Sequence, residues 1–258
     1  PTSKAISVIL SSVSFKSPMA EFNNASKVGD FTFTFKDCTG LEGAIPSELF
    51  TDSTSATSVY GVFMGCSGLT EVPADLFNNN TAIKNFGYTF HTCTGITEIP
   101  ASIFSQNTEA LYFDYTFFGC TKLSSIPQGL FTNNTKAQKF NQAFNGCTGL
   151  KGSIPTDLIS HCPDAEHFAW MFSECSGLTG SIPDGFFANR SKTTTFAGVF
   201  FKCSGLEGSI PANLFDNCRI SSISLILVQI LFIIFTLLFF ADFIMLSIST
   251  PCSIRKFK

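Results

Sequence analysis

The chain has 258 residues, a formal net charge of −3 and only 14% charged residues. Residues 1–219 contain no block of basic residues, so they lack the positive surface that a phosphate backbone requires, which argues against nucleic acid as a partner. Phenylalanine occurs 31 times and tryptophan once, which indicates that one aromatic position is filled repeatedly. The composition therefore favours a repeat protein.

Residues 1–37 are predicted to form a degenerate N-terminal repeat or cap. Pro18 and Phe22 keep the spacing found in the complete copies that follow, but Ser11 and Ser14 stand where a copy has its cysteine and leucine. Terminal coils of a stack commonly have such a more polar sequence because one of their faces meets water.

Residues 38–218 contain seven cysteine-phased copies of the pattern F-x3-F-x2-C-[ST]-x-L-x2(3)-[IV]-P, the first of which begins before this range at Phe31. Only Val59, in the second copy, departs from phenylalanine at the first position of the pattern. Each copy is marked by a cysteine, and the intervals between these cysteines are 27 or 28 residues: Cys38, Cys66, Cys93, Cys120, Cys147, Cys175 and Cys203. A fixed period in this range is typical of a solenoid. We therefore predict one right-handed α/β repeat solenoid from about residue 18 to residue 218.

Each copy is predicted to contain one short helix and one short strand. In the third copy, Phe86, Phe90 and Cys93 are spaced by four and three residues, so a helical turn would place them on one face. Ile96 and Ile99 fit a short strand that ends at the following proline. Stacked coils would bury these positions in continuous ladders, which a single coil is too small to do.

The 28-residue copies have a glycine before the Ile-Pro pair, as in "LEGAIP", "LKGSIP" and "LTGSIP". A bulge at this glycine would absorb the extra residue. If the strand alternates, the residues between leucine and Ile-Pro form an outward-facing polar strip: Glu42, Thr70, Glu71, Thr97, Glu98, Ser124, Ser125, Lys151, Thr179 and Glu207.

At "TFHTCTGITEIPASIF", "TFFGCTKLSSIPQGLF" and "AFNGCTGLKGSIPTDL" the chain resembles the BspA-like leucine-rich-repeat surface proteins. The resemblance extends over residues 18 to 218, and its specificity comes from seven copies in phase. It implies a leucine-rich-repeat-like fold, display on a cell surface, and adhesion to host or matrix. The longer period and the use of phenylalanine where that family often has methionine are departures from it.

The ten cysteines form either buried free thiols or disulfides. A ladder of one cysteine per coil has no natural pairing, which favours free thiols. Cys162 and Cys218 share another phase but lie two coils apart, about 10 Å at the spacing of strands, which is too far for a bridge. His161, Cys162, His167 and Cys175 could be read as a zinc site, but their spacing matches no standard finger.

No arrangement of nucleophile and base or of paired carboxylates is visible in the repeat, so we expect no enzyme activity and no cofactor. The aromatic residues Tyr112, Tyr115 and Trp170 are either binding anchors or packing residues. Four N-x-[ST] triplets begin at Asn24, Asn79, Asn133 and Asn189. They would be glycan acceptors in a eukaryotic secretory pathway and simple turn residues in a bacterium.

Residues 220–241 are 22 uncharged, mostly apolar residues, long enough for a helix that crosses a bilayer core of about 30 Å. Residues 242–258 form a short basic tail, which the positive-inside rule places in the cytoplasm and the repeats outside the cell. We therefore expect a single-pass cell-surface protein for adhesion or for binding of an extracellular protein or glycan. The alternative is a passive surface scaffold or stalk without a specific ligand.

Overall fold

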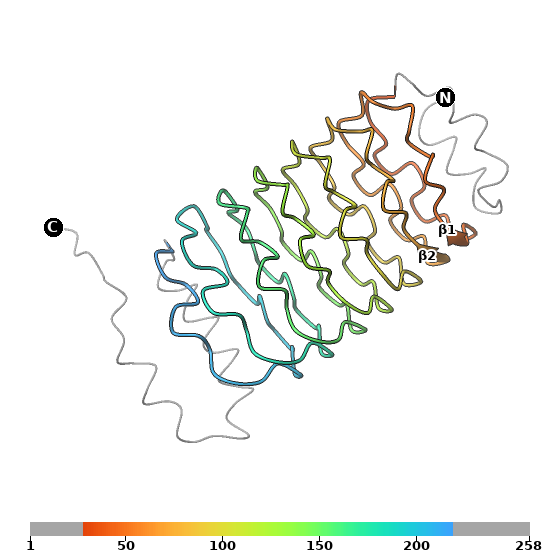
Figure 1. Cartoon of the computed structure of the whole chain (residues 1–258). Helices are drawn as coiled ribbons and strands as arrows, with labels where there is room; N and C mark the ends of the chain where they lie inside the picture. Colours follow the sequence, from red (N-terminus) through yellow and green to blue (C-terminus); the bar gives the residue numbers. More distant parts are fainter. Residues whose placement is uncertain (1–27, 219–258) are drawn as a thin grey trace.

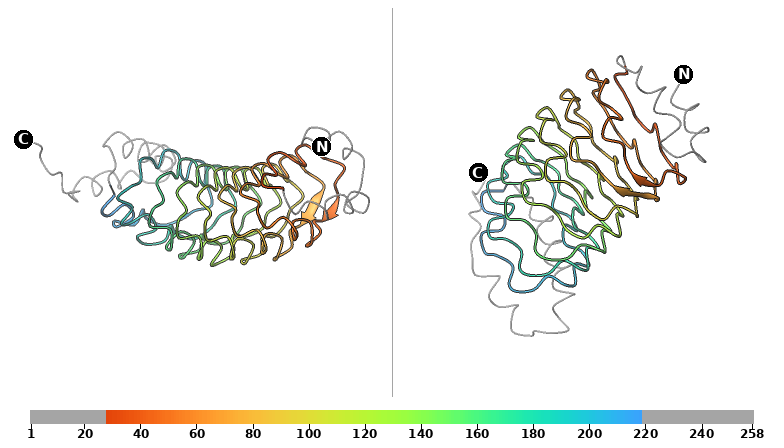
Figure 2. Two further views of the ribbon diagram at one scale, coloured as in Figure 1. Left: turned by 90° about the horizontal axis from the view of Figure 1, so that it is seen from above. Right: turned by 45° about the vertical axis from the view of Figure 1, so that its right-hand side comes forward.

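The computed structural model describes residues 28–218, which form one stack of similar coils. The chain winds regularly from the N-terminal to the C-terminal end of the stack, so that each coil lies beside the next one in the sequence (Figure 1). Seen from above, the stack is gently curved (Figure 2). The prediction of a solenoid is confirmed for these residues.

The short helix predicted in each coil is wrong: residues 28–218 contain no α-helix. The F-x3-F-x2-C segment is a series of tight turns, in which the amides of Thr34 and Cys38 donate to the carbonyls of Phe31 and Phe35 at 3.1 Å. The alternate amides of the segment donate instead to the next coil, at 2.6 to 2.9 Å: Phe31 to Ser58, Phe33 to Tyr60, Phe35 to Val62 and Asp37 to Met64. The same alternation recurs in the following coils.

An α-helix would satisfy its amides within the segment and leave the coils joined mainly by side chains. The turns satisfy half of the amides locally and use the other half to bond coil to coil. Both conformations place residues spaced by four and three on one buried face, as Phe86, Phe90 and Cys93 are. Side-chain periodicity therefore could not distinguish them.

These turns require a left-handed backbone at two positions of each segment. In the first copy Phe33 and Asp37 have φ values of +57° and +59°, and in the second copy glycines occupy both places, Gly61 and Gly65. Left-handed backbone disfavours residues with a Cβ by about 1–2 kcal/mol each. The hydrogen bonds between coils offset this strain where the residue is not glycine.

Regular strands are short. The strand β1 (Gly43–Ala44) pairs in parallel with β2 (Leu69–Glu71). The corresponding segments of later coils meet only at single bridges, Gly152 with Leu178 and Gly180 with Leu206. A second row of single parallel bridges runs beside the first phenylalanine of each copy and joins Asp30, Ser58, Asn85, Tyr112, Lys139, His167 and Thr195. The predicted strand thus contributes one or two pairs per coil at most.

The predicted glycine bulge is confirmed. The pairing of β1 and β2 shifts register between Gly43 and Ala44. Gly43, Gly152, Gly180 and Gly208 all have φ between +75° and +82°, a conformation that favours glycine. The extra residue of each longer copy is therefore absorbed locally, and the coils on either side stay in phase.

The core consists of ladders of like residues. The second phenylalanines of successive copies stack with ring centroids 5.4 to 5.8 Å apart and ring planes within 14° of parallel: Phe35, Phe63, Phe90, Phe117, Phe144, Phe172 and Phe200. Phe86, Phe113, Phe140, Phe168 and Phe196 form a parallel ladder at 5.5 to 5.8 Å. The predicted burial of these positions is confirmed.

The repeat cysteines form a ladder of free thiols. The Cys93 thiol donates to the carbonyl of Phe63 in the preceding coil at 3.0 Å, and Cys120 and Cys147 bond in the same way to Phe90 and Phe117. The seven repeat cysteines and Cys162 are all free thiols. Burial raises the pKa of these thiols, that of Cys66 and that of Cys203 to about 12. Cysteine is thus used as a small apolar residue with a weak donor.

A second polar ladder was missed by the sequence analysis. Asn80, Asn107 and Asn134 are fully buried, and each side-chain amide donates to two carbonyls of the preceding coil at 2.8 to 3.2 Å. The next coils have Cys162 and then Arg190 at this position, and the Arg190 guanidinium donates to the carbonyl of Cys162. The sequence did contain a sign of this ladder, because an asparagine recurs three residues after the phenylalanine at 77, 104 and 131.

Residues 1–27 of the predicted cap (1–37), the membrane span at 220–241 and the tail at 242–258 lie outside the described residues. Residues 28–37 are described, and Phe31 and Phe35 belong to the core of the first coil. Within residues 28–218, no helix that could cross a membrane is found. The proposed boundaries of the cap and the span therefore stay predictions.

Replacement of Phe117 by alanine should lower the free energy of unfolding by about 3–5 kcal/mol, because the side chain is fully buried between Phe90 and Phe144. Thermal unfolding followed by circular dichroism measures this effect. Phe33→Ala is the matched control. Because the Phe33 side chain is 38% exposed, its removal should lower the free energy of unfolding much less. Equal effects of both changes would contradict the ladder.

Candidate binding groove

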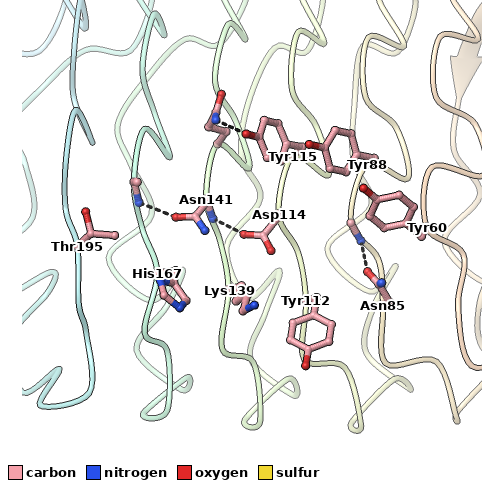
Figure 3. A pocket seen from close by; sticks show the side chains of 13 residues that line it. Tyr60, Asn85, Tyr88, Tyr112, Asp114, Tyr115, Lys139, Asn141, His167 and Thr195 are labelled. Atoms are coloured by element: carbon pink, nitrogen blue, oxygen red, sulfur yellow. Dashed lines mark hydrogen bonds between the residues drawn. The ribbon is translucent and has the colours of Figure 1, made fainter.

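Side chains beside the first phenylalanine of successive copies line an open groove of about 620 Å³. They come from one residue before and from one and two residues after that phenylalanine, so they form rows along the stack (Figure 3). We call this site the tyrosine groove, and its lining consists of Tyr60, Asn85, Gly87, Tyr88, Tyr112, Asp114, Tyr115, Lys139, Asn141, Gln142, His167, Ala169 and Thr195. Most of these side chains are half-buried.

Three tyrosines form a stack at one end of the groove. Tyr88 lies between Tyr60 and Tyr115, with ring centroids 5.1 and 4.4 Å away. The Gln142 amide donates a hydrogen bond to the Tyr115 hydroxyl. The faces of the Tyr88 ring are therefore covered by its neighbours, so a ligand cannot stack on them.

Glycines opposite the aromatic residues make this packing possible. A Cβ on Gly87 would lie 3.1 Å from the Tyr60 ring and from the Asn85 side chain, and a Cβ on Gly61 would lie 2.5 Å from the Phe33 ring. The Trp170 ring lies over Gly198 in the same manner. The rings of Phe33, Tyr60 and Trp170 are therefore each matched by a glycine in the next coil.

A hydrogen-bonded polar chain crosses the middle of the groove. The Asp114 carboxylate accepts from the backbone N–H of Asn141 at 2.9 Å, and the Asn141 side-chain oxygen accepts from the N–H of Ala169 at 3.0 Å (Figure 3). Burial raises the pKa of Asp114, and the hydrogen bonds from Asn141 and the charges of Lys139 and His167 oppose this shift only in part. A carboxylate held in this way in a concave site is a common feature of functional sites.

The charges of the groove nearly cancel. Asp114 is its one carboxylate, and Lys139 lies 5.1 Å from the centre of the Tyr112 ring. Burial raises the pKa of Tyr60 and Tyr88, so both phenols stay protonated at neutral pH. The groove offers hydrogen-bond donors, acceptors and aromatic edges to a ligand, but its lining contains no nucleophile activated by a base.

The structure gives different places to the three aromatic residues that the sequence analysis named as binding anchors or packing residues. Tyr112 and Tyr115 do line the groove, whereas Trp170 packs edge-on against Phe201 with centroids 5.5 Å apart. The sequence analysis missed the contributions of Tyr60, Tyr88, Asp114, Lys139 and Asn141. The available signal was the repeat phase, since all of them stand within two residues of the first-phenylalanine position, which Val59 occupies in the second copy.

The polar strip predicted between leucine and Ile-Pro is confirmed, because every residue assigned to it is exposed. The residues of the zinc interpretation lie in different rows: Cys162 and Cys175 belong to separate buried ladders, His167 lines the groove, and His161 is exposed beside Ser160. Within the described part of the chain, no group of three or more histidine, cysteine or acidic residues could hold a metal ion.

Comparison with known proteins gives a likeness of fold only. No family model matches the chain, and no curated protein matches it. Among solved structures it is similar to a plant peptide hormone receptor solved with its peptide (14% identity, 81% of this chain and 47% of that one, TM-score 0.28). It is also similar to the Arabidopsis receptor kinase HAESA (18% identity, 81% and 35%, TM-score 0.41) and to a leucine-rich-repeat protein of Leptospira interrogans (12% identity, 75% and 53%, TM-score 0.34).

These neighbours are leucine-rich-repeat proteins, and the chain spans about half of the receptor ectodomains or less. With TM-scores below 0.5, the likenesses carry no argument about ligand or activity. The fold rests on the coil-to-coil hydrogen bonds described above.

Replacement of Asp114 by asparagine should raise the unfolding midpoint at pH 7. Burial raises the pKa of this carboxyl above its ordinary 3.8, so its contribution to stability is fully present below that value and is lost as the pH rises through the folded pKa. The uncharged asparagine avoids this loss and can still accept from Asn141, and the advantage should vanish below about pH 4.

Thermal melts of both proteins from pH 3 to pH 8 measure the effect. Asp184→Asn, at an exposed carboxyl outside the groove, is the control and should leave the midpoint unchanged. A variant that is less stable than the wild type at pH 7 would show that the Asp114 carboxylate serves the fold.

Proposed function

We propose that this protein is a non-catalytic, membrane-anchored cell-surface solenoid of the BspA-like type, which binds a protein or glycan ligand in the tyrosine groove. The observation that carries the proposal is the groove itself. It combines a stack of tyrosines with a hydrogen-bonded Asp114–Asn141 pair, and both are held by backbone bonds between coils.

The chemistry of the groove suits such ligands. Tyrosine is enriched among the residues that dominate binding energy at protein interfaces, because it combines apolar area with a hydroxyl group. The hydroxyls of Tyr60 and Tyr112 have no hydrogen-bond partner within residues 28–218, so they remain available to a ligand. The near-zero charge favours an uncharged peptide segment or a neutral sugar over a nucleic acid.

The rigidity of the stack also supports binding. Each groove residue is fixed by the turn that carries it and by the bonds of that turn to the neighbouring coils. A site that is already ordered loses less entropy when its ligand binds, which raises affinity. Catalysis would require unlike reactive groups converging on one point, and the groove lining does not contain such a set.

The location at the cell surface is proposed from the apolar segment 220–241, from the basic tail that follows it and from the family resemblance. Antibodies against the repeats should label intact cells that express the full chain. Labelling that appears only after permeabilisation would contradict this orientation.

Ligands for the groove can be selected from a displayed random-peptide library and from a glycan array with the full protein as bait. The double variant Tyr112→Phe and Asp114→Asn removes one hydroxyl and one charge without creating a cavity. It should weaken selected ligands at least tenfold, because hydrogen bonds to charged groups contribute about 1.5–3 kcal/mol.

Glu98→Gln is the matched control in the exposed polar strip, and it should change affinity less than twofold. Loss of binding in the Glu98 variant with retention in the groove variant would place the site on the strip instead. Failure to select any ligand from either library would favour the passive scaffold.

A further inference from the structure

One exposed row of side chains lies along the edge of the solenoid, two residues after the end of the "LF" pair of each copy, a pair that reads Leu-Ile at 158–159. We call it the edge row, and all of its members are exposed: Asp52, Asn79, Gln106, Asn133, His161, Asn189 and Asn217. Asn79, Asn133 and Asn189 stand on every second coil of this row, and each begins an N-x-[ST] triplet. Every such triplet within residues 28–218 thus has the same place in the fold.

The fold presents all three triplets in the same way. The hydroxyl residues Thr81, Thr135 and Ser191 are exposed like the asparagines that precede them. The middle residues are buried, and their side chains bond to carbonyls of the preceding coil: Asn80, Asn134 and Arg190. Each triplet is therefore a surface turn anchored at its centre, with both of its recognition groups facing water.

The side-chain amides of Asn79 and Asn133 can each exchange one N–H hydrogen for a sugar and still keep their hydrogen bonds. The Asn133 Nδ2 donates one hydrogen bond, to the carbonyl of Ser105 at 2.9 Å, and the Asn79 Nδ2 donates one, to Thr51 at 3.3 Å. An N-substituted amide keeps one N–H, so both bonds can persist after modification. By contrast, the buried Asn80 uses both of its N–H groups within the ladder.

We propose that Asn79, Asn133 and Asn189 are acceptors of N-linked oligosaccharides. The donor is a polyprenyl-diphosphate oligosaccharide, and a secretory-pathway transferase catalyses the step. The Nδ2 atom forms a bond to C1 of the first sugar while the bond from C1 to the diphosphate oxygen breaks. The diphosphate leaves with the electron pair, and the amide proton passes to a base of the transferase.

With these glycans attached, the surface of the solenoid would have one edge covered by sugar and a groove that stays open. Two coils correspond to about 10 Å at the spacing of strands, so the glycans would stand apart along one edge. None of the residues that line the tyrosine groove belongs to the edge row, so the groove stays open to its ligand. The edge itself would be shielded from other proteins.

The test is expression of the full chain behind a cleavable secretory signal in a eukaryotic cell, with an Asn-Gly-Thr tag at the N-terminus as an internal control for entry. Peptide mass spectrometry before and after peptide-N-glycosidase treatment then identifies occupied asparagines by their conversion to aspartate. We expect occupancy at Asn79, Asn133 and Asn189. Bare asparagines at two or more of these positions, in chains whose tag is glycosylated, would overturn the proposal.

Variants of the hydroxyl residues test each site without touching the asparagine. Thr81→Ala, Thr135→Ala and Ser191→Ala should each remove one glycan, whereas Thr108→Ala, at the same place in a coil without a triplet, should remove none. Gln106→Asn creates a triplet with Asn107 and Thr108 in the same row and should add a further glycan. Absence of a glycan at this new site would show that a position in the edge row does not decide which triplets are glycosylated.

Discussion

The structure depends on one interaction, the hydrogen bond from alternate backbone amides of one coil to carbonyls of the next. In the third coil these bonds run from Phe86, Tyr88 and Phe90 to the coil that follows, at 2.8 to 2.9 Å. They set the distance between coils, and that distance brings equivalent side chains of consecutive copies into contact. The phenylalanine stacks and the thiol ladder follow from this spacing, because each partner lies one repeat away in the sequence.

The same constraint explains how the coils tolerate unequal lengths. A register error of one residue would move every buried side chain of a coil out of its ladder. The longer copies avoid this with a glycine in left-handed conformation, such as Gly152 or Gly180, whose extra residue bulges beside the strand segment. Length variation is thus kept away from the phenylalanine ladders and from the groove.

Chemical variation between the copies is found at positions that line the groove or face water. Positions that face the core keep the same residue type from copy to copy, while positions beside the first phenylalanine change from Tyr60 to Asp114 to Asn141 along the stack. Because the backbone geometry is the same in each coil, these changes produce a pattern of chemistry on a regular lattice. The groove, the polar strip and the edge row are three such patterns on one scaffold.

The sequence by itself determined the period, the solenoid, the identity of the buried ladders, the glycine bulges and the exposed polar strip. These features depend on which residue types recur at fixed intervals, and burial of apolar side chains is a strong and local consequence of that recurrence. The sequence also contained the signal of the asparagine ladder at Asn80, Asn107 and Asn134, although its meaning required the neighbouring carbonyls to be in place.

Only the tertiary structure decided that the F-x3-F-x2-C segment forms turns and not a helix, since the choice depends on carbonyls that belong to the next coil. It likewise decided that Tyr60, Tyr88 and Tyr115 meet, although 28 and 27 residues separate them in the chain. Their contact requires a fixed distance between coils, and for Tyr60 also a glycine, Gly87, opposite the ring. Neither condition can be read from one copy alone. The groove is therefore a property of the stack, because no single coil contains enough of its lining to form it.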